Sequence, residues 1–279
     1  MPNPKTILIT GCSSGFGRVT ALHLARRGWR VFATVRRETD RESLLAETAG
    51  LPVEVFLCDV ADDAQVAALG QAVAERTPRL DALLNNAGTA FPGPLEFQPL
   101  ADLRRQLDIN VVAQIAVTQA VLPRLKAARG IILNVSSMGG RLVFPITGAY
   151  HASTYAWEAL SDALRIELAP FGVRVVVLEP GGSPTGIWGA GGRHADAVWH
   201  DPRADAYRPL MDRYLQLAGA SAREGFPPEQ FAALVERVLA ASRPRARYVI
   251  PARAGINIRM RALLPDWAWD ALLRRLFRW

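Results

Sequence analysis

Short apolar runs alternate with longer helical patterns along most of this 279-residue chain, and no other feature restricts the possible folds as strongly. Strands that alternate with helices in this way are typical of a parallel sheet covered by helices on both faces. The sequence therefore predicts an α/β fold: a doubly wound parallel sheet of the Rossmann type, in three layers (α/β/α) and in a single domain over residues 1–279. The expected strands are 6–10, 30–35, 53–57, 81–85, 130–135, 173–179 and 248–250, and the expected helices are 19–27, 41–49, 63–75, 99–128 (with a break near Asn110), 149–169 and 227–239.

A glycine-rich loop follows the first expected strand, at the end of the sheet where ligands of such folds bind. It reads T-G-C-S-S-G-F-G, from Thr10 to Gly17. Glycines let the backbone approach a ligand closely, and the unpaired N–H groups of the following helix can bind a pyrophosphate. We interpret the segment as a dinucleotide-binding loop, with a purely structural turn as the alternative.

Two arginines, Arg36 and Arg37, end the second expected strand, and no acidic residue stands at that point. An acid there would bond the ribose 2′-OH of NAD, whereas arginine suits the 2′-phosphate of NADP. The pattern favours NADP(H) as the cofactor, with two solvated arginines in a loop as the alternative.

Other strand ends also carry residues suited to lining a cofactor. Asp59 follows the third strand, where it would lie beside an adenine or serve as a turn residue. The segment Asn85–Gly88 follows the fourth strand, and Glu179–Gly186 follows the sixth and would cover the nicotinamide side. Asn110 stands in the middle of a helical pattern, where asparagine is unfavourable, so it either faces a water network or is exposed.

The stretch from Asn134 to Leu168 contains the candidate catalytic residues. A strand ends in two serines, and Tyr150 opens a long helical pattern thirteen residues after Ser137. This spacing can bring the serine hydroxyl and the tyrosine phenol to one substrate oxygen. Thr154 stands one turn further along the same helix face, where a cation would have favoured ionised tyrosine.

Residues 187–225 are rich in glycine and aromatic residues, and we expect an irregular, mobile lid over a substrate pocket. Its aromatic side chains suit a bulky apolar small molecule, or else they pack the lid onto the core. The spacing of His194 and His200 does not indicate a metal site, and we expect no metal. The aromatic residues of the lid include Trp188, Trp199, Tyr207 and Tyr214.

The positive charge of the chain is concentrated near one end. Residues 241–279 contain nine arginines and two aspartates, which account for the whole net charge of +7. The remainder is neutral, so we do not expect a nucleic-acid binder. The segment 262–279 is basic and amphipathic, and we expect it to dock on protein, with attachment to an anionic membrane surface as the less favoured alternative. Its expected apolar side comprises Trp267, Leu272, Leu273, Leu276 and Phe277.

The cellular location follows from what the sequence lacks. It shows no run of 18 uninterrupted apolar residues and no secretory leader pattern. Its two cysteines, Cys12 and Cys58, do not suggest a disulfide framework. We therefore expect a cytoplasmic protein.

Taken together, the motifs occur in a specific order: Thr10-Gly11, Gly15, Gly17, Asp59, Asn85-Asn86-Ala87-Gly88, Asn110, Ser137, Tyr150 and Pro180-Gly181. In this order they resemble the short-chain dehydrogenase/reductase (SDR) family from about residue 5 to residue 186. The glycine loop and the A-T-V-R sequence look like the 17β-hydroxysteroid dehydrogenase-like and retinol dehydrogenase-like members, which mostly use NADP(H). The resemblance implies a homodimer or homotetramer that transfers a hydride between nicotinamide and a carbonyl carbon.

The resemblance also implies roles for individual residues. Tyr150 would be the general acid/base, Ser137 would hold the substrate oxygen, and Asn110 would position a water for proton relay. The fourth family residue is a lysine that binds the nicotinamide ribose, and its position is occupied here by Thr154. Ser13 and Arg36 would contact the 2′-phosphate. The full set of implied cofactor contacts is Gly11, Ser13, Ser14, Gly15, Phe16, Gly17, Arg36, Asp59, Val60, Asn86, Ala87, Gly88, Pro180, Gly181 and Thr185.

The threonine in place of the family lysine leaves three interpretations. Thr154 bonds the ribose while another cation, His151 or Arg141, supplies the charge. Alternatively, the protein is a slow reductase, or one working in the direction that needs a protonated tyrosine. In the third, it is a lyase- or isomerase-type enzyme or a catalytically weak NADP(H)-binding protein. We favour an NADP(H)-dependent carbonyl reductase or alcohol dehydrogenase, because Ser137, Tyr150 and Asn110 are all present.

Overall fold

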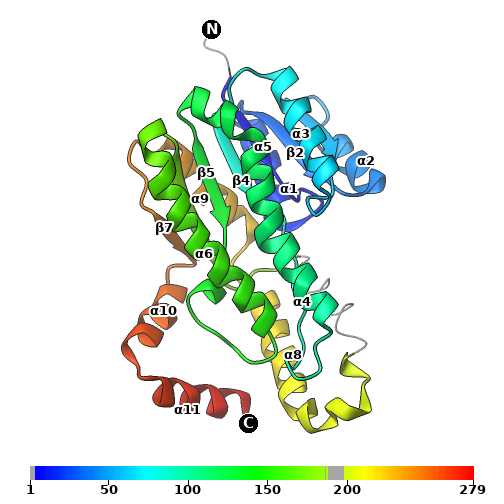
Figure 1. Cartoon of the computed structure of the whole chain (residues 1–279), viewed down its shortest axis with the longest axis vertical. Coiled ribbons are helices and arrows are strands. Elements are labelled where there is room, and N and C mark those ends of the chain that lie inside the picture. The colour runs from blue at the N-terminus through cyan, green and yellow to red at the C-terminus, as the bar shows by residue number, and fades with distance from the viewer. Residues whose placement is uncertain (1–3, 186, 188–197) are drawn as a thin grey trace.

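The computed structural model describes residues 4–185, 187 and 198–279. Seven parallel strands form one sheet in the order β3-β2-β1-β4-β5-β6-β7. This arrangement confirms the predicted doubly wound sheet and single domain (Figure 1). The strands are β1 (Thr6–Ile9), β2 (Arg30–Val35), β3 (Val53–Leu57), β4 (Ala82–Asn85), β5 (Ile131–Val135), β6 (Arg174–Pro180) and β7 (Arg247–Ile250).

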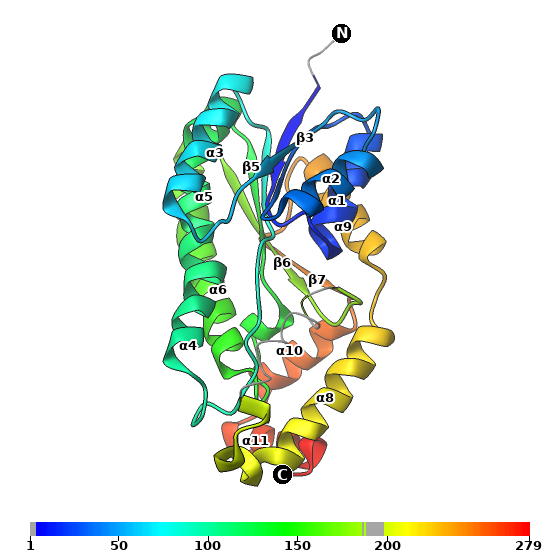
Figure 2. The ribbon, with the colours of Figure 1, turned by 90° about the vertical axis from the view of Figure 1, so that its right-hand side faces the viewer.

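Helices cover both faces of the sheet (Figure 2). One face carries α1 (Gly15–Arg26), α2 (Glu38–Glu47) and α9 (Pro228–Ala240), and the other carries α3 (Asp63–Arg76), α5 (Ala113–Ala128) and α6 (Gly148–Leu168). The three-layer prediction is therefore confirmed. The remaining helices are α4 (Leu100–Leu107), α8 (Arg208–Arg223), α10 (Ala254–Leu263) and α11 (Asp266–Phe277).

The side chains of β1 show why the sheet must be covered twice. Ile7 and Ile9 belong to the hydrophobic cluster beneath α1 and α9, whereas Leu8 belongs to the cluster beneath α3 and α5. All three are fully buried. Successive residues of a strand point to opposite faces, so a strand that is apolar throughout needs a helix layer on each side.

Most element boundaries agree with the predictions, and the differences have local causes. The first helix begins at Gly15, inside the glycine loop. Its free N–H groups therefore lie at the edge of the sheet. Asp62 caps α3, accepting hydrogen bonds from the backbone N–H groups of Ala64 and Gln65. The expected break near Asn110 is a π-helical turn over Asp108–Val112, which separates α4 from α5.

We expected irregular structure over residues 187–225. Within this range, the residues that the structure describes are mostly helical, so the prediction is wrong for them. Pro202–Tyr207 is a 3₁₀ helix and α8 follows it directly. Leu210, Met211 and Tyr214 lie at helical spacing and pack together, and this periodicity outweighs the local glycine and proline content. Trp188 and His194 lie outside the described residues.

The C-terminal helical region also differs from its prediction, since α10 begins before the expected segment 262–279. Trp267 was expected on the apolar side, but 76% of its surface is exposed. Leu272 and Leu276 were also expected there and are exposed. Leu273 and Phe277 face the body of the protein as predicted, and Trp269 joins them, with Trp269 and Phe277 buried. These three residues are four positions apart and share one helix face, whereas Trp267 lies off that face.

Candidate active site

The polar motifs predicted at the strand ends meet at the carboxyl edge of the sheet. The loops after β1 and β4 contact each other directly there, because the two strands are neighbours. The Thr10 hydroxyl accepts hydrogen bonds from the backbone N–H groups of Asn86 and Ala87, both at 3.0 Å. Asn86 in turn donates its side-chain amide to the carbonyls of Thr10 and Gly11, at 2.8 and 3.1 Å. Asn86 therefore holds the glycine loop in shape.

The glycine loop has no room for side chains at its turn. Gly11 has a φ of +72°, which disfavours other residues. A Cβ on Gly17 would lie 2.4 Å from the Gly11 carbonyl oxygen and 2.6 Å from the Asn86 amide nitrogen. The start of α1 thus lies directly against the loop, with its first N–H groups at the sheet edge, and the site fits a dinucleotide pyrophosphate.

Other residues predicted to contact the cofactor contribute in different ways. The ring of Phe16 stacks on Phe231, with centroids 4.2 Å apart, so only its backbone faces the loop. Ser14 is exposed at the N-terminus of α1, and its side chain does not cap the helix. Thr185 lies over the loop, since a Cβ on Gly15 would be 3.2 Å from the Thr185 Cβ. The segment after β6 therefore covers the glycine loop, as expected.

The two arginines after β2 are not equivalent. Arg37 forms a two-pronged ion pair with Asp40, with its Nε and Nη2 donating at 2.8 and 3.1 Å. Arg36 is exposed and makes no hydrogen bond or ion pair with any residue that the structure describes. Arg36 is thus available to an anionic group at this edge, whereas Arg37 is occupied.

Asp59 and Val60 follow β3 at the same edge. The Asp59 carboxylate accepts a hydrogen bond from the Ala61 N–H at 3.1 Å and closes a local turn, as the alternative structural role of Asp59 implied. The side chain of Val60 is buried in the core. What Val60 can offer a ligand is its backbone.

Ser137 and Tyr150 come together as predicted. Ser137 ends the loop after β5, where its hydroxyl accepts a hydrogen bond from the Gly139 N–H at 3.0 Å. Burial raises the pKa of the Tyr150 phenol above its ordinary value, and a hydrogen bond with the Ser137 side chain opposes part of that rise. The phenol is therefore protonated at neutral pH.

Asn110 lies in the π-helical turn and is buried, so the alternative that it is exposed is wrong. Its oxygen accepts from the Thr89 N–H at 2.9 Å, and its amide donates to the Thr89 carbonyl at 3.0 Å and to the Ser153 hydroxyl at 3.1 Å. The Ser153 hydroxyl donates to the Tyr150 carbonyl at 2.7 Å. Asn110 is thus tied through Ser153 to the first turn of α6, a contact that the sequence analysis did not foresee.

Neither His151 nor Arg141 replaces the positive charge of the family lysine next to Tyr150. Thr154 is buried, and its hydroxyl donates to the carbonyls of Tyr150 and His151 at 3.1 and 3.0 Å. Both ring nitrogens of His151 are bonded, Nδ1 to the Gly139 carbonyl and Nε2 to the Phe144 N–H, and burial lowers its pKa. His151 is therefore neutral. The expectation that His151 supplies charge is wrong.

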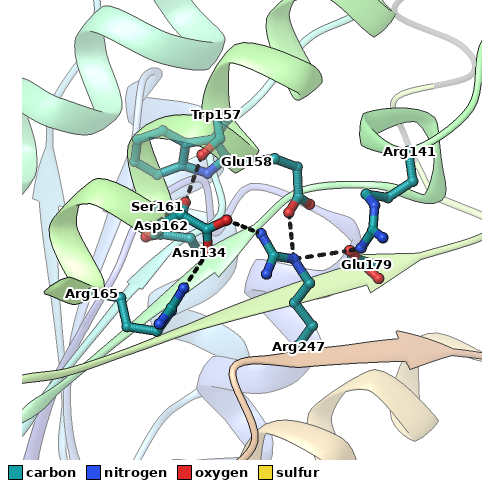
Figure 3. Close-up of polar contacts among 9 residues, drawn as sticks. All are labelled: Asn134, Arg141, Trp157, Glu158, Ser161, Asp162, Arg165, Glu179 and Arg247. Atoms are coloured by element: carbon teal, nitrogen blue, oxygen red, sulfur yellow. Dashed lines mark hydrogen bonds and ion pairs between the residues drawn. The ribbon is translucent and has the colours of Figure 1, made fainter.

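Arg141 is also committed elsewhere, as part of an ionic cluster behind the site (Figure 3). It donates to Glu179 at 3.2 Å, and Glu179 is buried at the end of β6. Arg247 of β7 donates to Glu158 and Asp162 on α6, at 3.0 and 2.7 Å, and lies 3.6 Å from Glu179. Burial and the nearby Glu158 raise the pKa of Glu179.

The sequence alone does not indicate this cluster, because its members are far apart in the chain. Glu158 stands one turn beyond Thr154, and Glu179 directly precedes Pro180. The Pro180 carbonyl accepts a hydrogen bond from the Ser137 hydroxyl at 3.4 Å, and the Gly181 N–H donates to the Ile250 carbonyl at 2.7 Å. The cluster therefore joins α6, β6 and β7 directly beneath the loops that carry Ser137, Pro180 and Gly181.

Tyr214 is the lid aromatic that the structure brings to the site. It lies on α8, within electrostatic reach of Tyr150, and burial raises its pKa to about 12. Ile146, Leu210 and Phe144 pack in the same cluster. Tyr214 therefore joins an apolar cluster and comes within electrostatic reach of Tyr150.

A sheet of this order with a glycine loop and a serine–tyrosine pair at its carboxyl edge is the arrangement that the resemblance to the short-chain dehydrogenase/reductase family implied. The family model described as short chain dehydrogenase matches residues 5–194. The chain belongs to this family of oxidoreductases, as the sequence motifs suggested.

Three similar proteins extend over nearly the whole chain. The uncharacterized oxidoreductase YusZ of Bacillus subtilis is 34% identical, over 98% of both chains. Retinol dehydrogenase 7 of Rattus norvegicus is 32% identical, over 96% of this chain and 87% of its own. A 3-ketodihydrosphingosine reductase of Bacteroides thetaiotaomicron is 31% identical, over 97% of both chains.

Solved structures of similar proteins contain nicotinamide cofactors. A short chain dehydrogenase/reductase from Burkholderia phymatum in complex with NAD has a TM-score of 0.81 and 27% identity, over 93% of both chains. An actinorhodin polyketide ketoreductase with NADPH has a TM-score of 0.75 and 26% identity, over 91% of this chain and 98% of its own. Both dinucleotides occur among these neighbours, so the comparisons support a nicotinamide cofactor without separating NAD from NADP.

Proposed function

We propose that the protein is an NADP(H)-dependent reductase that converts a ketone of a bulky, apolar substrate to a secondary alcohol. One observation carries the proposal: Tyr150 is a partly buried phenol with a raised pKa, bonded to Ser137, and neither His151 nor Arg141 supplies a charge beside it. A protonated phenol is the acid that carbonyl reduction requires.

The position of Arg36 supports NADPH rather than NADH as the cofactor. The exposed, unpaired guanidinium at the end of β2 suits a 2′-phosphate, and no acidic side chain from the same turn pairs with it. Gly11, Gly15 and Gly17 would hold the pyrophosphate, with Ser13 close to the 2′-phosphate. Asp59 and Val60 would border the adenine; Ala87, Gly88, Pro180, Gly181 and Thr185 would border the nicotinamide half.

When bound, the cofactor supplies the hydride that reaches the carbonyl carbon. The Ser137 hydroxyl holds the carbonyl oxygen by a hydrogen bond, and the Tyr150 Oη–H transfers its proton to that oxygen as the alcohol forms. Tyr150 is then reprotonated from solvent. Both amide hydrogens of Asn110 are already donated, so only the second lone pair of its oxygen is free for a water on that route.

The substrate class rests on the apolar cluster around Tyr214 and on the relatives. Ile146, Leu210 and Phe144 are apolar and pack in the same cluster as Tyr214, which lies within electrostatic reach of Tyr150. The names of two relatives refer to retinol and to 3-ketodihydrosphingosine, both largely hydrocarbon molecules. A ketone with a long or bulky hydrocarbon group fits both observations.

The proposal is tested by measuring NADPH and NADH binding through cofactor fluorescence, together with NADPH oxidation against a panel of apolar ketones. We expect turnover that falls by about 10²–10⁴-fold in Tyr150→Phe, the range for loss of a positioned proton donor. Tyr155→Phe is the matched control, since this exposed phenol lies on the same helix. Equal loss in both variants would remove Tyr150 from its role.

A catalytically weak NADP(H)-binding protein is the second candidate, and the absence of the family lysine at Thr154 favours it. In that case NADPH binds tightly but no ketone is reduced, even after Thr154→Lys. Tight NADH binding with weak NADPH binding would instead overturn the cofactor assignment.

A further inference from the structure

We propose that the corner between α10 and α11 docks on an anionic membrane surface, with Leu263 and Trp267 entering the headgroup region and surrounding arginines contacting the lipid phosphates. The proposal rests on the exposure and charge of this corner and does not depend on the proposed reaction.

Exposed apolar side chains are concentrated in these two helices. Six of the sixteen large hydrophobic residues that are exposed in the described structure lie between 254 and 279, about a tenth of the chain. Leu263 is 84% exposed and Trp267 is 76% exposed, and only Leu264, Pro265 and Asp266 separate them. Single exposed apolar residues are ordinary, but a cluster with an exposed tryptophan indicates an interaction surface.

Each helix buries one face and exposes the other. On α10, Ala254 and Ile258 are buried, while Ile256, Arg259 and Leu263 share the opposite, exposed face. Ile256 and Leu263 are seven residues apart, with Arg259 between them, so the exposed face alternates apolar and cationic groups.

On α11 the buried face is the one formed by Trp269, Leu273 and Phe277. Trp267, Arg274 and Arg278 lie on the exposed side, seven and four residues apart. Long arginine side chains beside a tryptophan are typical of interfacial helices, since the guanidinium reaches the phosphates while the ring enters the acyl boundary.

The corner is held in place before any partner binds. Arg261 donates to the Asp266 carboxylate at 2.7 Å and lies against the Leu264 carbonyl, at 3.4 Å, across the bend. The buried faces of both helices pack on Leu142 and Phe144, in the loop after β5. Figures 1 and 2 show α10 and α11 together at the end of the molecule opposite the N-terminus.

The net positive charge of this corner favours an anionic membrane over a second copy of the chain as its binding partner. Residues 253–279 contain six arginines and two aspartates, and Asp266 is already paired with Arg261. A two-fold symmetric dimer through this surface would place the two basic corners against each other. Anionic headgroups complement the same charge, with each arginine contributing to binding near the surface.

No helix among the described residues is both long enough and apolar enough to cross a bilayer. The association that we propose is therefore attachment to the surface, which depends on the apolar contact and the charges together.

The test uses the full chain and sedimentation with vesicles of phosphatidylcholine alone and of phosphatidylcholine mixed with phosphatidylglycerol. We expect binding only to the mixed vesicles, weakened by salt. Replacing Arg274, Arg275 and Arg278 together by glutamine should weaken it on the order of 100-fold. Leu263→Ser with Trp267→Ser should also abolish measurable binding, because the apolar contact is lost.

Matched controls separate the surface from a general charge effect. Arg104, Arg105 and Arg237 are exposed arginines outside α10 and α11, and their triple replacement by glutamine should reduce binding far less. Ile166→Ser removes an apolar side chain of α6 that is 68% exposed and should leave binding unchanged. Binding that the control variants reduce as strongly as the corner variants would overturn the assignment of this surface.

Two further outcomes would overturn the proposal itself. One is the absence of binding to phosphatidylglycerol vesicles at low salt. The other is self-association in sedimentation velocity that the corner variants abolish while vesicles are not bound, which would assign the surface to a second copy of the chain. Circular dichroism and thermal unfolding of each variant show that lost binding does not reflect lost folding.

Discussion

Thr154 determines how the site works at the scale of single residues. A lysine one turn after the tyrosine would bring a positive charge beside the phenol and lower its pKa. Here the threonine hydroxyl bonds only to the helix backbone, and the nearest candidates for a substitute, His151 and Arg141, are neutral or occupied. The Tyr150 phenol thus stays protonated over the neutral range.

This predicts opposite pH responses for the two reaction directions. Because the folded pKa of Tyr150 is raised, ketone reduction should stay constant through neutral pH and fall only at strongly alkaline pH. Alcohol oxidation needs tyrosinate and should rise with pH. Thr154→Lys should lower the pKa by about 1–3 units, so oxidation near neutral pH should increase roughly 10- to 1,000-fold while reduction changes little.

Initial rates in both directions, measured from neutral to alkaline pH, check this prediction. Thr154→Val is the control, since it removes the hydroxyl without adding charge and should leave the pH profiles in place. Profiles that do not shift in Thr154→Lys would show that Tyr150 is not the titrating group.

Arg36 and Arg37 provide a second residue-scale prediction. Arg36→Ala should weaken NADPH binding by about 10- to 100-fold, the value of a charge-assisted hydrogen bond, and leave NADH binding unchanged. Arg37→Ala should affect neither cofactor strongly, because its guanidinium is already paired with Asp40. Titration of cofactor fluorescence measures both. A similar loss for the two variants would contradict the assignment of Arg36.

At this scale, the candidate catalytic residues and the glycine loop could be predicted from the sequence. The residues whose hydrogen bonds position them could not. Ser137 and Tyr150 lie within hydrogen-bonding reach of each other, as their spacing predicted. Ser153 was missed, because a serine in a helix carries no signal that its partner is Asn110, 43 residues away. Asn86 was expected to line the cofactor, and only the structure shows that its amide is used to hold the loop.

At the scale of elements, the ionic cluster around Arg247 fastens the edge of the sheet to the catalytic helix. Arg247 stands on the edge strand β7, and its partners lie on α6 and β6. Glu158 and Glu179 are almost completely buried, whereas about a quarter of the Arg247 side chain is exposed. Removing Arg247 would take away the guanidinium that donates to the buried Glu158 and would leave Glu179 to its ion pair with Arg141.

Arg247→Met should therefore lower the free energy of unfolding by about 2–4 kcal/mol, somewhat less than for a fully buried pair because Arg247 is partly exposed. Arg245→Met removes an exposed arginine just before the same strand and should have little effect. Chemical denaturation of the two variants measures the difference. Equal stability of Arg247→Met and the parent protein would show that the cluster contributes nothing net.

The elements themselves were largely predictable, and the exceptions have physical causes. Buried parallel strands are apolar runs, so β1 to β6 were found to within a residue or two. Asn110 indicated an irregularity in its helix, and a π-helical turn accommodates it. The helix α8 was missed because two prolines and a glycine in and beside it suggested a loop, although Leu210, Met211 and Tyr214 have helical spacing.

At the scale of the whole molecule, α10 and α11 pack on the body of the protein. The buried face of α11 includes Trp269, whereas the sequence predicted Trp267 on that face. Trp269→Ala should lower the free energy of unfolding by about 3–5 kcal/mol, as for other buried aromatic residues. Trp267→Ala should change it by less than about 0.5 kcal/mol, since its ring lies in solvent. Thermal unfolding of the two variants distinguishes the faces, and equal destabilisation would contradict the observed packing.

The packing of Trp269 and Phe277 on the loop after β5 also bears on the order in which the protein is made. Both helices leave the ribosome after every strand of the sheet, so a nascent chain can form its dinucleotide cradle while Leu142 and Phe144 are still uncovered. A chain that stops before Ala254 would retain the glycine loop, Ser137 and Tyr150 but lack the helices that pack on Leu142 and Phe144. Under the proposed function, the dinucleotide site would thus form during synthesis before the apolar cluster around Phe144 is complete.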